Sequence, residues 1–269
     1  MAGLNRDAIQ RGLNDPAAWH LHVFDEVPST NTLALDLAAQ DAPEWTALLA
    51  DSQTNGRGRA GREWRTPHGT ALAISIIVRP RVAADARPWV GLAAALATRD
   101  AIEHVTGMSG LVKWPNDVLI SGRKVAGILL ETRHGAVSDA ASAVVIGIGV
   151  NVNNRAAAFP ESFRDTATSL LDASGTVTDR QRLAAAILNE VHQVSGELPH
   201  GIETLRARWR SASATFGAMV AVSTPGGLVE GIDHGLDPQG RLIVRTRDGE
   251  RAIHTGEVLL CRTLAPQTT

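Results

Sequence analysis

The stretch Gln53-Thr-Asn-Gly-Arg-Gly-Arg-Ala-Gly-Arg-Glu-Trp-Arg65 is the feature from which the rest of this sequence can be interpreted. It holds four arginines and three glycines, and it follows an apolar run at 45–50 that predicts a buried strand. Glycine lets backbone N–H groups approach a ligand closely, and arginine presents a planar charged fork to phosphate or carboxylate oxygens. A loop that wraps a polyanion is one interpretation, and a mobile surface loop is the other. The spacing excludes a P-loop, because the pattern G-x-x-x-x-G-K-S/T is absent.

The two lysines point to a second stretch. The chain has 26 basic residues, of which only Lys113 and Lys124 are lysine. Both fall within residues 113–127, which read Lys-Trp-Pro-Asn-Asp and, after four residues, Gly-Arg-Lys-Val-Ala-Gly. A lysine ammonium is a compact charge that reaches an anionic oxygen end-on. Chance placement explains this proximity poorly, so both lysines are candidate anion-binding groups.

Composition argues against several classes of protein. The net charge of −2 is unlike that of a general nucleic-acid-binding protein, and an aromatic content of 4% is low for a module that stacks bases. The single cysteine, Cys261, excludes an internal disulfide framework and fits a reducing compartment. No apolar run approaches the ~20 residues of a membrane span, and the N-terminus lacks an apolar signal core. These features predict a cytoplasmic protein that makes no membrane contact.

The hydrophobic pattern predicts an α+β fold with a mixed or antiparallel sheet, because most strands precede the long helices. From Phe216 onward, short strands and a hairpin signal at Asp248-Gly249 predict a small β-barrel of SH3-like size. The predicted domains are therefore residues 1–215 and 216–269. The expected helices are 4–13, 33–40, 88–105, 179–197 and 201–212, and the expected strands are 19–24, 45–50, 70–78, 111–114, 118–120, 124–131, 143–150, 218–223, 228–233, 241–244, 251–254 and 258–260.

Taken together, the motifs resemble those of biotin protein ligases, the biotin–acetyl-CoA-carboxylase ligases. The matching segments are Gly56-Arg-Gly-Arg-x-Gly-Arg-x-Trp64, Lys113-Trp-Pro-Asn-Asp117, Lys124-x-x-Gly127, Ser29-Thr-Asn31, Gly147-Ile-Gly-Val-Asn-Val-Asn153 and Ala167-Thr-Ser-Leu170. Several motifs in one order are far more specific than any one of them. Lipoate ligases share the catalytic fold, so a lipoate ligase-like adenylating enzyme is the alternative. The Gly-Arg-Gly-Arg loop with Lys-Trp-Pro-Asn-Asp favours biotin.

The resemblance implies a reaction in two steps. Biotin and ATP would give biotinyl-5′-AMP and pyrophosphate, and a lysine of a biotin carboxyl carrier protein domain of an acyl-CoA carboxylase would then take the biotin. The first step brings a carboxylate to the α-phosphate, so a cluster of cations would relieve the repulsion between two anions. Mg²⁺ is expected to arrive with ATP, since the sequence shows no His or carboxylate cluster for a dedicated metal site.

The resemblance also assigns roles to individual residues. The expected catalytic residues are Lys124, Arg57 and Arg59; the expected biotin contacts are Ser29, Thr30, Asn31, Gln53, Gly56, Arg57, Lys124 and Gly127; and the expected nucleotide contacts are Arg59, Arg62, Trp64, Lys113, Asn116, Asp117 and Asn151. Asn153 is a weaker nucleotide candidate. Alternatives stay open at three places: residues 29–31 can cap a helix, Trp64 can be a core residue, and Asp117 can serve a turn with Pro115.

Two further expectations concern what surrounds this core. Some members of the family carry an N-terminal winged helix-turn-helix, and the fewer than 25 residues before the expected catalytic core are too few for one. We therefore expect no sequence-specific DNA binding. We also expect the loop 54–66 to be disordered when empty and to close on ligand, because it offers few apolar anchors.

Overall fold

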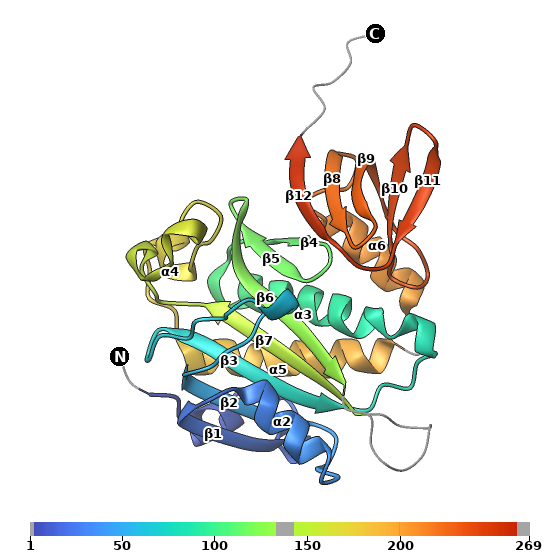
Figure 1. The fold of residues 1–269 in the computed structure, drawn as a ribbon. Helices are drawn as coiled ribbons and strands as arrows, with labels where there is room; N and C mark the ends of the chain where they lie inside the picture. Colours follow the sequence, from blue (N-terminus) through green and yellow to red (C-terminus); the bar gives the residue numbers. More distant parts are fainter. Residues whose placement is uncertain (1–2, 133–142, 199, 263–269) are drawn as a thin grey trace.

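The computed structural model describes residues 3–132, 143–198 and 200–262. Two sheets and six α-helices form the described part (Figure 1). The strands of the first sheet are β1 (His20–Val27), β2 (Thr46–Gln53), β3 (Ala71–Val78), β4 (Leu111–Lys113), β5 (Asp117–Ile120), β6 (Arg123–Thr132) and β7 (Val144–Asn151). The helices are α1 (Arg6–Arg11), α2 (Thr30–Ala38), α3 (Pro88–Thr106), α4 (Leu170–Ser174), α5 (Arg180–Glu197) and α6 (Ile202–Ala212), and short 3-10 turns lie at Pro16–Ala18, Arg59–Gly61, Ala84–Ala86, Ala156–Ala158 and Glu161–Phe163. None of the described helices combines the length and the apolar character that a membrane crossing requires.

The first sheet is mixed, with strand order β1-β2-β3-β7-β6-β5-β4. Strands β1 and β2 are parallel and are joined through α2, whereas the other neighbouring strands of the sheet are antiparallel. A parallel pair needs such a crossover, while antiparallel neighbours can be joined by short turns. The predicted α+β class with a mixed sheet is confirmed.

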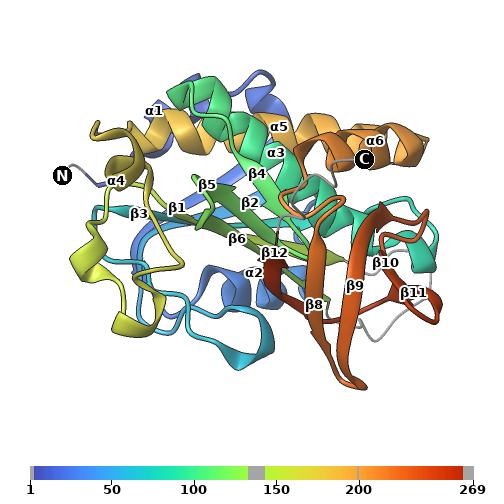
Figure 2. The same cartoon turned by 90° about the horizontal axis from the view of Figure 1, so that it is seen from above.

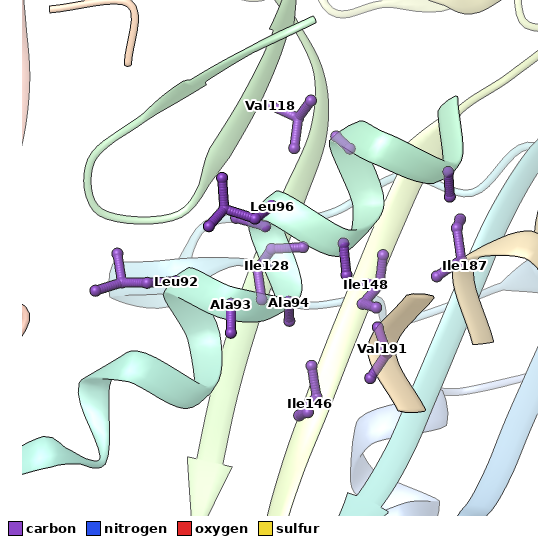
Figure 3. Close-up of a cluster of buried hydrophobic side chains, with 14 of the residues drawn as sticks. Leu92, Ala93, Ala94, Leu96, Val118, Ile128, Ile146, Ile148, Ile187 and Val191 are labelled. Atoms are coloured by element: carbon purple, nitrogen blue, oxygen red, sulfur yellow. The ribbon is translucent and has the colours of Figure 1, made fainter. Parts of the chain in front are cut away.

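The main core lies between this sheet and the helices α3 and α5, which cover one face (Figures 1 and 2). In Figure 3, Leu96 of α3, Ile148 of β7 and Ile187 of α5 belong to one apolar cluster. Because side chains alternate along a strand, Ile146, Ile148 and Val150 of β7 face this core. The intervening residues of β7, including Gly147 and Gly149, therefore face the opposite side, where the candidate site lies.

The C-terminal unit is a five-stranded antiparallel sheet, with order β11-β10-β9-β8-β12. Its strands are β8 (Met219–Thr224), β9 (Gly227–Leu236), β10 (Leu242–Thr246), β11 (Gly249–Ile253) and β12 (Glu257–Arg262). The prediction of a small all-β unit after residue 216 is confirmed. The exact domain bounds stay a prediction, and residues 263–269 lie outside the described part of the chain.

Two boundaries in the N-terminal half differ from the expectation. Strand β1 continues to Val27, because its pairing with β2 extends to Gln53. Helix α2 begins at Thr30 rather than at residue 33, because the Ser29 side chain accepts a hydrogen bond from the Thr32 N–H at 3.4 Å and caps the helix. The sequence analysis missed α4, a short helix capped in the same way by Ser169. Both caps lie in segments that were recognised as family motifs.

Asp233 of β9 connects the C-terminal sheet to the segment that leads into it. Its carboxylate is buried and accepts hydrogen bonds from Thr215 Oγ1 at 2.6 Å and from the Gly235 N–H at 2.7 Å. Burial raises the pKa of Asp233 above its usual value of 3.8, more than the two hydrogen bonds lower it. The folded state therefore binds this proton more tightly than the unfolded state does.

The Asp233→Asn substitution is expected to reduce the pH dependence of stability. The contribution of the raised pKa is fully present below 3.8 and is lost as the pH rises through the folded pKa. An asparagine keeps the polar contacts without a buried charge. Thermal unfolding at about pH 4 and about pH 7 would give the Tm of both proteins. The Tm of the variant should be higher relative to that of the wild type at pH 7 than at pH 4. An unchanged difference would contradict the raised pKa.

Candidate active site

Three glycines form a flat surface on the face of the sheet opposite α3. We call Gly127, Gly147 and Gly149 the glycine floor. A Cβ atom at Gly149 would lie 2.2 Å from Trp64 Cε2, and one at Gly147 would lie 2.3 Å from Asn31 Oδ1. Both distances are far below van der Waals contact. The indole of Trp64 and the amide of Asn31 can therefore approach the sheet this closely only over glycine.

A cavity of about 710 Å³ opens above the glycine floor. Its walls come from the start of α2, the loop after β2, strands β4 to β7, the segment 154–167 and the start of β12. Of the residues that the sequence predicts for the site, it is lined by Ser29, Thr30, Asn31, Gln53, Arg57, Arg59, Arg62, Trp64, Lys113, Asn116, Asp117, Lys124, Gly127 and Asn151. The structure thus brings residues from five separate motifs to one place. Their individual roles stay predictions.

Gly56 does not line this cavity and instead closes the base of the loop. Its carbonyl accepts a hydrogen bond from the Trp64 N–H at 2.9 Å, and a Cβ here would lie 2.3 Å from the Trp64 carbonyl. Isolated bridges pair Gln53 with Thr66 and Arg57 with Glu63. The loop is therefore a narrow, paired hairpin in this structure, and its expected disorder without ligand stays a prediction. On its other side it lines a second cavity of about 710 Å³, which Gly56 also borders.

A polar network forms one end of the first cavity. Gln53 Oε1 accepts hydrogen bonds from the Thr30 N–H at 2.8 Å and from Thr30 Oγ1 at 3.1 Å. Ser75 Oγ lies 2.8 Å from Thr30 Oγ1 and 2.5 Å from Asn31 Oδ1. Ser29 caps α2, as the structural alternative proposed, and lines the cavity as well. Helix capping and ligand contact are therefore compatible for this segment.

The sequence analysis missed Ser75. It is fully buried on β3, where it shares one face of the sheet with the paired Gly147 of β7. The available signal was its position as the single hydroxyl residue in the apolar run Ala-Leu-Ala-Ile-Ser-Ile-Ile-Val at 71–78. A buried hydroxyl needs a partner, and here the partners are the two residues from α2.

Both lysines line the cavity. Lys124 Nζ lies 2.6 Å from Asp117 Oδ1 and 5.7 Å from the centre of the Trp64 ring. Lys113 Nζ donates to the Val258 carbonyl of β12 at 3.3 Å. Asp117 therefore forms an ion pair with a candidate catalytic lysine, in addition to its place at the start of β5. Trp64 lies in the cavity rather than in the core, so the core alternative is wrong.

Three arginines from the loop complete the cation cluster. Arg57 Nη2 lies 3.1 Å from Glu131 Oε2, and Arg62 Nη1 lies 2.8 Å from Glu257 Oε1. Arg59 Nη1 donates to Asn116 Oδ1 at 3.4 Å, and burial lowers the pKa of Arg59. Each arginine thus contacts a protein oxygen.

The Trp-Pro-Asn part of the lysine motif has a structural function. Trp114 is buried, the peptide bond to Pro115 is cis, and the Trp114 Nε1–H donates to the Gly240 carbonyl at 3.3 Å. Asn116 Nδ2 donates to the Ile128 carbonyl at 2.8 Å, and the Ile128 N–H donates back to the Asn116 carbonyl at 2.8 Å. These bonds fix the turn between β4 and β5 against β6 and leave the Asn116 side-chain oxygen facing Arg59.

The three asparagines after β7 have different surroundings. Asn151 Nδ2 donates to the Thr168 carbonyl at 3.1 Å and borders the cavity. Asn153 exchanges two hydrogen bonds of 2.9 Å with the Thr178 backbone and is not among the lining residues, so it is a structural residue. Asn154, which the sequence analysis passed over, is buried and lines the cavity. No signal in the sequence marked Asn154, because the family motif at 147–153 ends one residue before it.

Three acidic residues in or beside the site have cationic or amide partners. Glu131 contacts Arg57 and also accepts from Asn31 Nδ2 at 2.8 Å, while Asp117 and Glu257 pair with Lys124 and Arg62. Among the described residues, no group of three or more His, Cys, Asp or Glu side chains could hold a metal ion. Sequence reasoning missed Glu131 and Glu257, because nothing in a sequence marks which carboxylate will meet a given arginine.

The Arg62–Glu257 contact connects the loop to the C-terminal sheet. The hydrogen bond from Arg62 is the largest of the influences that hold the pKa of Glu257 below its usual 4.5, and Lys113 and Lys124 act in the same direction. The contribution to stability is present above pH 4.5 and is lost as the pH falls through the folded pKa. Both side chains are nearly half exposed, so solvent screens the pair.

The Glu257→Gln substitution is expected to accelerate tryptic cleavage after the loop arginines roughly 1.5- to 5-fold, as loss of an exposed ion pair makes loop opening easier. Peptide mapping during limited digestion near pH 8 would measure the cleavage rate. Glu250→Gln is the matched control, because Glu250 pairs with Arg245 at 3.2 Å within the C-terminal sheet. Equal cleavage rates in both variants would contradict a connection between Glu257 and the loop.

Comparisons with known proteins agree with this geometry. Residues 23–151 match the biotin/lipoate A/B protein ligase family, and residues 215–260 match the biotin protein ligase C terminal domain. The biotin–acetyl-CoA-carboxylase ligase of Mycobacterium tuberculosis is 36% identical over 249 residues, which cover 90% of this chain and 89% of that protein. The bifunctional ligase/repressor BirA of Bacillus subtilis is 35% identical over 259 residues, covering 96% of this chain and 79% of that protein. Among solved structures, the biotin protein ligase from Aquifex aeolicus in complex with biotin and ATP has a TM-score of 0.76 and 29% identity, covering 91% of this chain and 99% of that one.

Proposed function

This chain belongs to the biotin/lipoate A/B protein ligase family, and we propose from that premise how its cavity carries out biotin ligation. The protein is an ATP-dependent biotin–acetyl-CoA-carboxylase ligase, which activates biotin and transfers it to the carboxylase. Six cationic side chains around one cavity support the assignment: Arg57, Arg59, Arg62, Arg65, Lys113 and Lys124. Such a cluster suits a reaction in which two anions must meet.

We propose that biotin occupies the end of the cavity with the polar network. The ureido ring of biotin has two N–H donors and one carbonyl acceptor. Thr30, Asn31 and Gln53 line this end and supply hydroxyl and amide groups of both kinds, and the buried Ser75 hydrogen-bonds to Thr30 and Asn31 behind them. Ser29 and Gly127 would complete the contacts. The carboxylate of biotin would then point along the floor towards Lys124 and Arg57.

In the first step, a biotin carboxylate oxygen attacks the α-phosphorus of ATP. A bond forms between these two atoms, the bond from the α-phosphorus to the bridging oxygen breaks, and pyrophosphate leaves with that oxygen. We propose that Lys124 exchanges Asp117 for the carboxylate and then for the acyl-phosphate oxygens. Arg57 would lie over the same oxygens, while Arg59, Arg62 and Lys113 would hold phosphates. Trp64, Asn116, Asp117 and Asn151 are the other proposed nucleotide contacts.

In the second step, the amine of a lysine on the acceptor attacks the acyl carbon, an amide forms and AMP leaves. We propose that the acceptor is the biotin carboxyl carrier protein domain of an acyl-CoA carboxylase and that Asp117 orients the attacking amine. Mg²⁺ is proposed to enter with ATP, because Glu131, Glu257 and Asp117 are already paired with cations. It would neutralise phosphate charge there. A cytoplasmic location is proposed from the sequence.

Pyrophosphate release from ATP tests the assignment, measured with biotin, with lipoate and with no acid added. Release that requires biotin is the expected result. Release that requires lipoate instead would favour the alternative, a lipoate ligase-like adenylating enzyme. No acid-dependent release from the folded protein would contradict both adenylating functions.

A further inference from the structure

Glu131, near the end of β6, contacts two proposed ligand-binding residues through a single oxygen atom. Its Oε2 accepts a hydrogen bond from Asn31 Nδ2 at 2.8 Å and another from Arg57 Nη2 at 3.1 Å. Glu131 itself borders the second cavity and does not line the first, and its side chain is 23% exposed. Glu131 is therefore placed to act on the site through other side chains, without touching a ligand.

The contact with Asn31 sets the direction of the hydrogen bonds in the polar network. An ionised carboxylate only accepts, so the Asn31 amide must turn its NH₂ group to Glu131 and its Oδ1 atom to Ser75. Because Oδ1 cannot donate, the single hydroxyl proton of Ser75 is used on Asn31. Thr30 must then donate its own proton to Ser75 Oγ, 2.8 Å away, or to Gln53 Oε1, 3.1 Å away. Either way the Thr30 oxygen is left as an acceptor, which is what an N–H of the ureido ring needs.

The contact with Arg57 reaches the opposite end of the proposed biotin position. Arg57 Nη2 donates to Glu131 and also to Thr32 Oγ1 in the first turn of α2, at 3.3 Å. Both contacts use one nitrogen, whereas a guanidinium carries five N–H donors. Arg57 can therefore keep Nη2 on Glu131 and turn its other N–H groups to a carboxylate. The Oε2 atom of Glu131 thus connects the residue beside the ring to the residue over the acid group.

We propose that Glu131 is a positioning residue that couples recognition of the biotin ring by Asn31 to the placement of Arg57 over the biotin carboxylate. This inference rests on the proposed function, because it takes biotin as the acid. Ordering a glutamate side chain costs conformational entropy. Once one contact has fixed the carboxylate, the second forms on a side chain that is already in place. The two ends of the substrate therefore share one support, and loss of either contact loosens the other.

The first test measures biotin binding by calorimetry and pyrophosphate release by steady-state kinetics. Glu131→Ala should raise the Kd for biotin about tenfold, the effect of losing a charge-assisted hydrogen bond, and should lower kcat while the KM for ATP stays nearly unchanged. Glu131→Gln keeps the shape and an acceptor oxygen, so it should recover most of the affinity. Glu203→Gln is the matched control, because Glu203 pairs with Arg206 within α6 and lines neither cavity.

A double-mutant cycle tests the coupling itself. Asn31→Ala and Arg57→Ala should weaken biotin binding by less in combination than the product of their separate effects, because each already loosens the shared support. In the Glu131→Ala background the two effects should multiply. Glu131→Asp, whose carboxylate is one methylene short of the two donors, is a second background and should also lose the coupling. Calorimetry needs no turnover, so the low activity expected of Arg57→Ala does not affect the measurement.

Three outcomes would overturn the inference. Independent effects of Asn31→Ala and Arg57→Ala with Glu131 present would show that the two ends are not coupled. Equal coupling with and without the Glu131 carboxylate would place the support elsewhere. A lower Tm in Glu131→Ala with an unchanged Kd for biotin would mean that Glu131 only stabilises the fold. Failure of the wild type to bind biotin would instead refute the proposed function.

Discussion

Replacing Lys124 with alanine is expected to lower biotin-dependent pyrophosphate release by about a hundredfold or more, the scale observed when one preorganised donor is removed. Lys124 Nζ lies 2.6 Å from Asp117 and 5.7 Å from the centre of the Trp64 ring, and Lys124 lines the cavity. In the alanine variant, Asp117 becomes an unpaired carboxylate where two further anions must approach. Repulsion is therefore added to the loss of the cation, and single-turnover pyrophosphate release would measure the combined effect.

The fold should survive this substitution, because the backbone of Lys124 holds its place without the side chain. Its N–H donates to the Thr166 carbonyl at 2.8 Å, and its carbonyl accepts from the Thr168 N–H at 2.8 Å. Arg123→Ala is the matched control, because it removes a neighbouring cation that does not line the cavity. If Lys124→Ala released pyrophosphate at the rate of the control, the central role of Lys124 would be wrong.

The resemblance in the sequence was sufficient to predict the residues at the centre of the site. Glycine, arginine and lysine at fixed spacings occur together because a loop must approach an anion closely and neutralise it. The alternation of residues along β7 also predicts the position of the glycines. Ile146 and Ile148 face the core, so Gly147 and Gly149 must face the other side of the sheet. The sequence did not reveal that two side chains would occupy the space above those glycines.

Long-range pairings were beyond sequence reasoning. Glu131, Glu257 and Ser75 complete the site through contacts with residues 44 to 195 positions away. Periodicity and propensity report only local geometry, so they cannot select one carboxylate from the 28 acidic residues. The same limit hid the parallel pairing of β1 with β2, which depends on the path of α2. Local signals thus identified the cations of the family pattern but not the side chains that contact them in the structure.

The second large effect is expected from Gly149→Ala, a change of one methyl group. The new Cβ would lie 2.2 Å from Trp64 Cε2 and 2.4 Å from Trp64 Nε1, so the indole must leave the glycine floor. Trp64 belongs to the cationic loop, and its ring lies 5.7 Å from Lys124 Nζ. Displacing the indole would therefore disturb both the loop and the surroundings of Lys124. A misplacement of about 1 Å in a catalytic arrangement can reduce the rate about a hundredfold. We expect a loss of that order in kcat/KM for ATP.

A double-mutant cycle with Trp64→Ala separates this steric effect from general damage to the sheet. Once the indole is removed, the added methyl has nothing to displace there, so Gly149→Ala/Trp64→Ala should be no less active than Trp64→Ala alone. Gly196→Ala in α5 is the control, because a Cβ at that position has no neighbour within 4 Å and alanine favours a helix. Additive losses from Gly149→Ala and Trp64→Ala would show that the glycine acts through the strand itself. A coupled loss would show that the flat floor exists to seat the tryptophan, and that the position of Trp64 in turn aligns the loop arginines with the lysine.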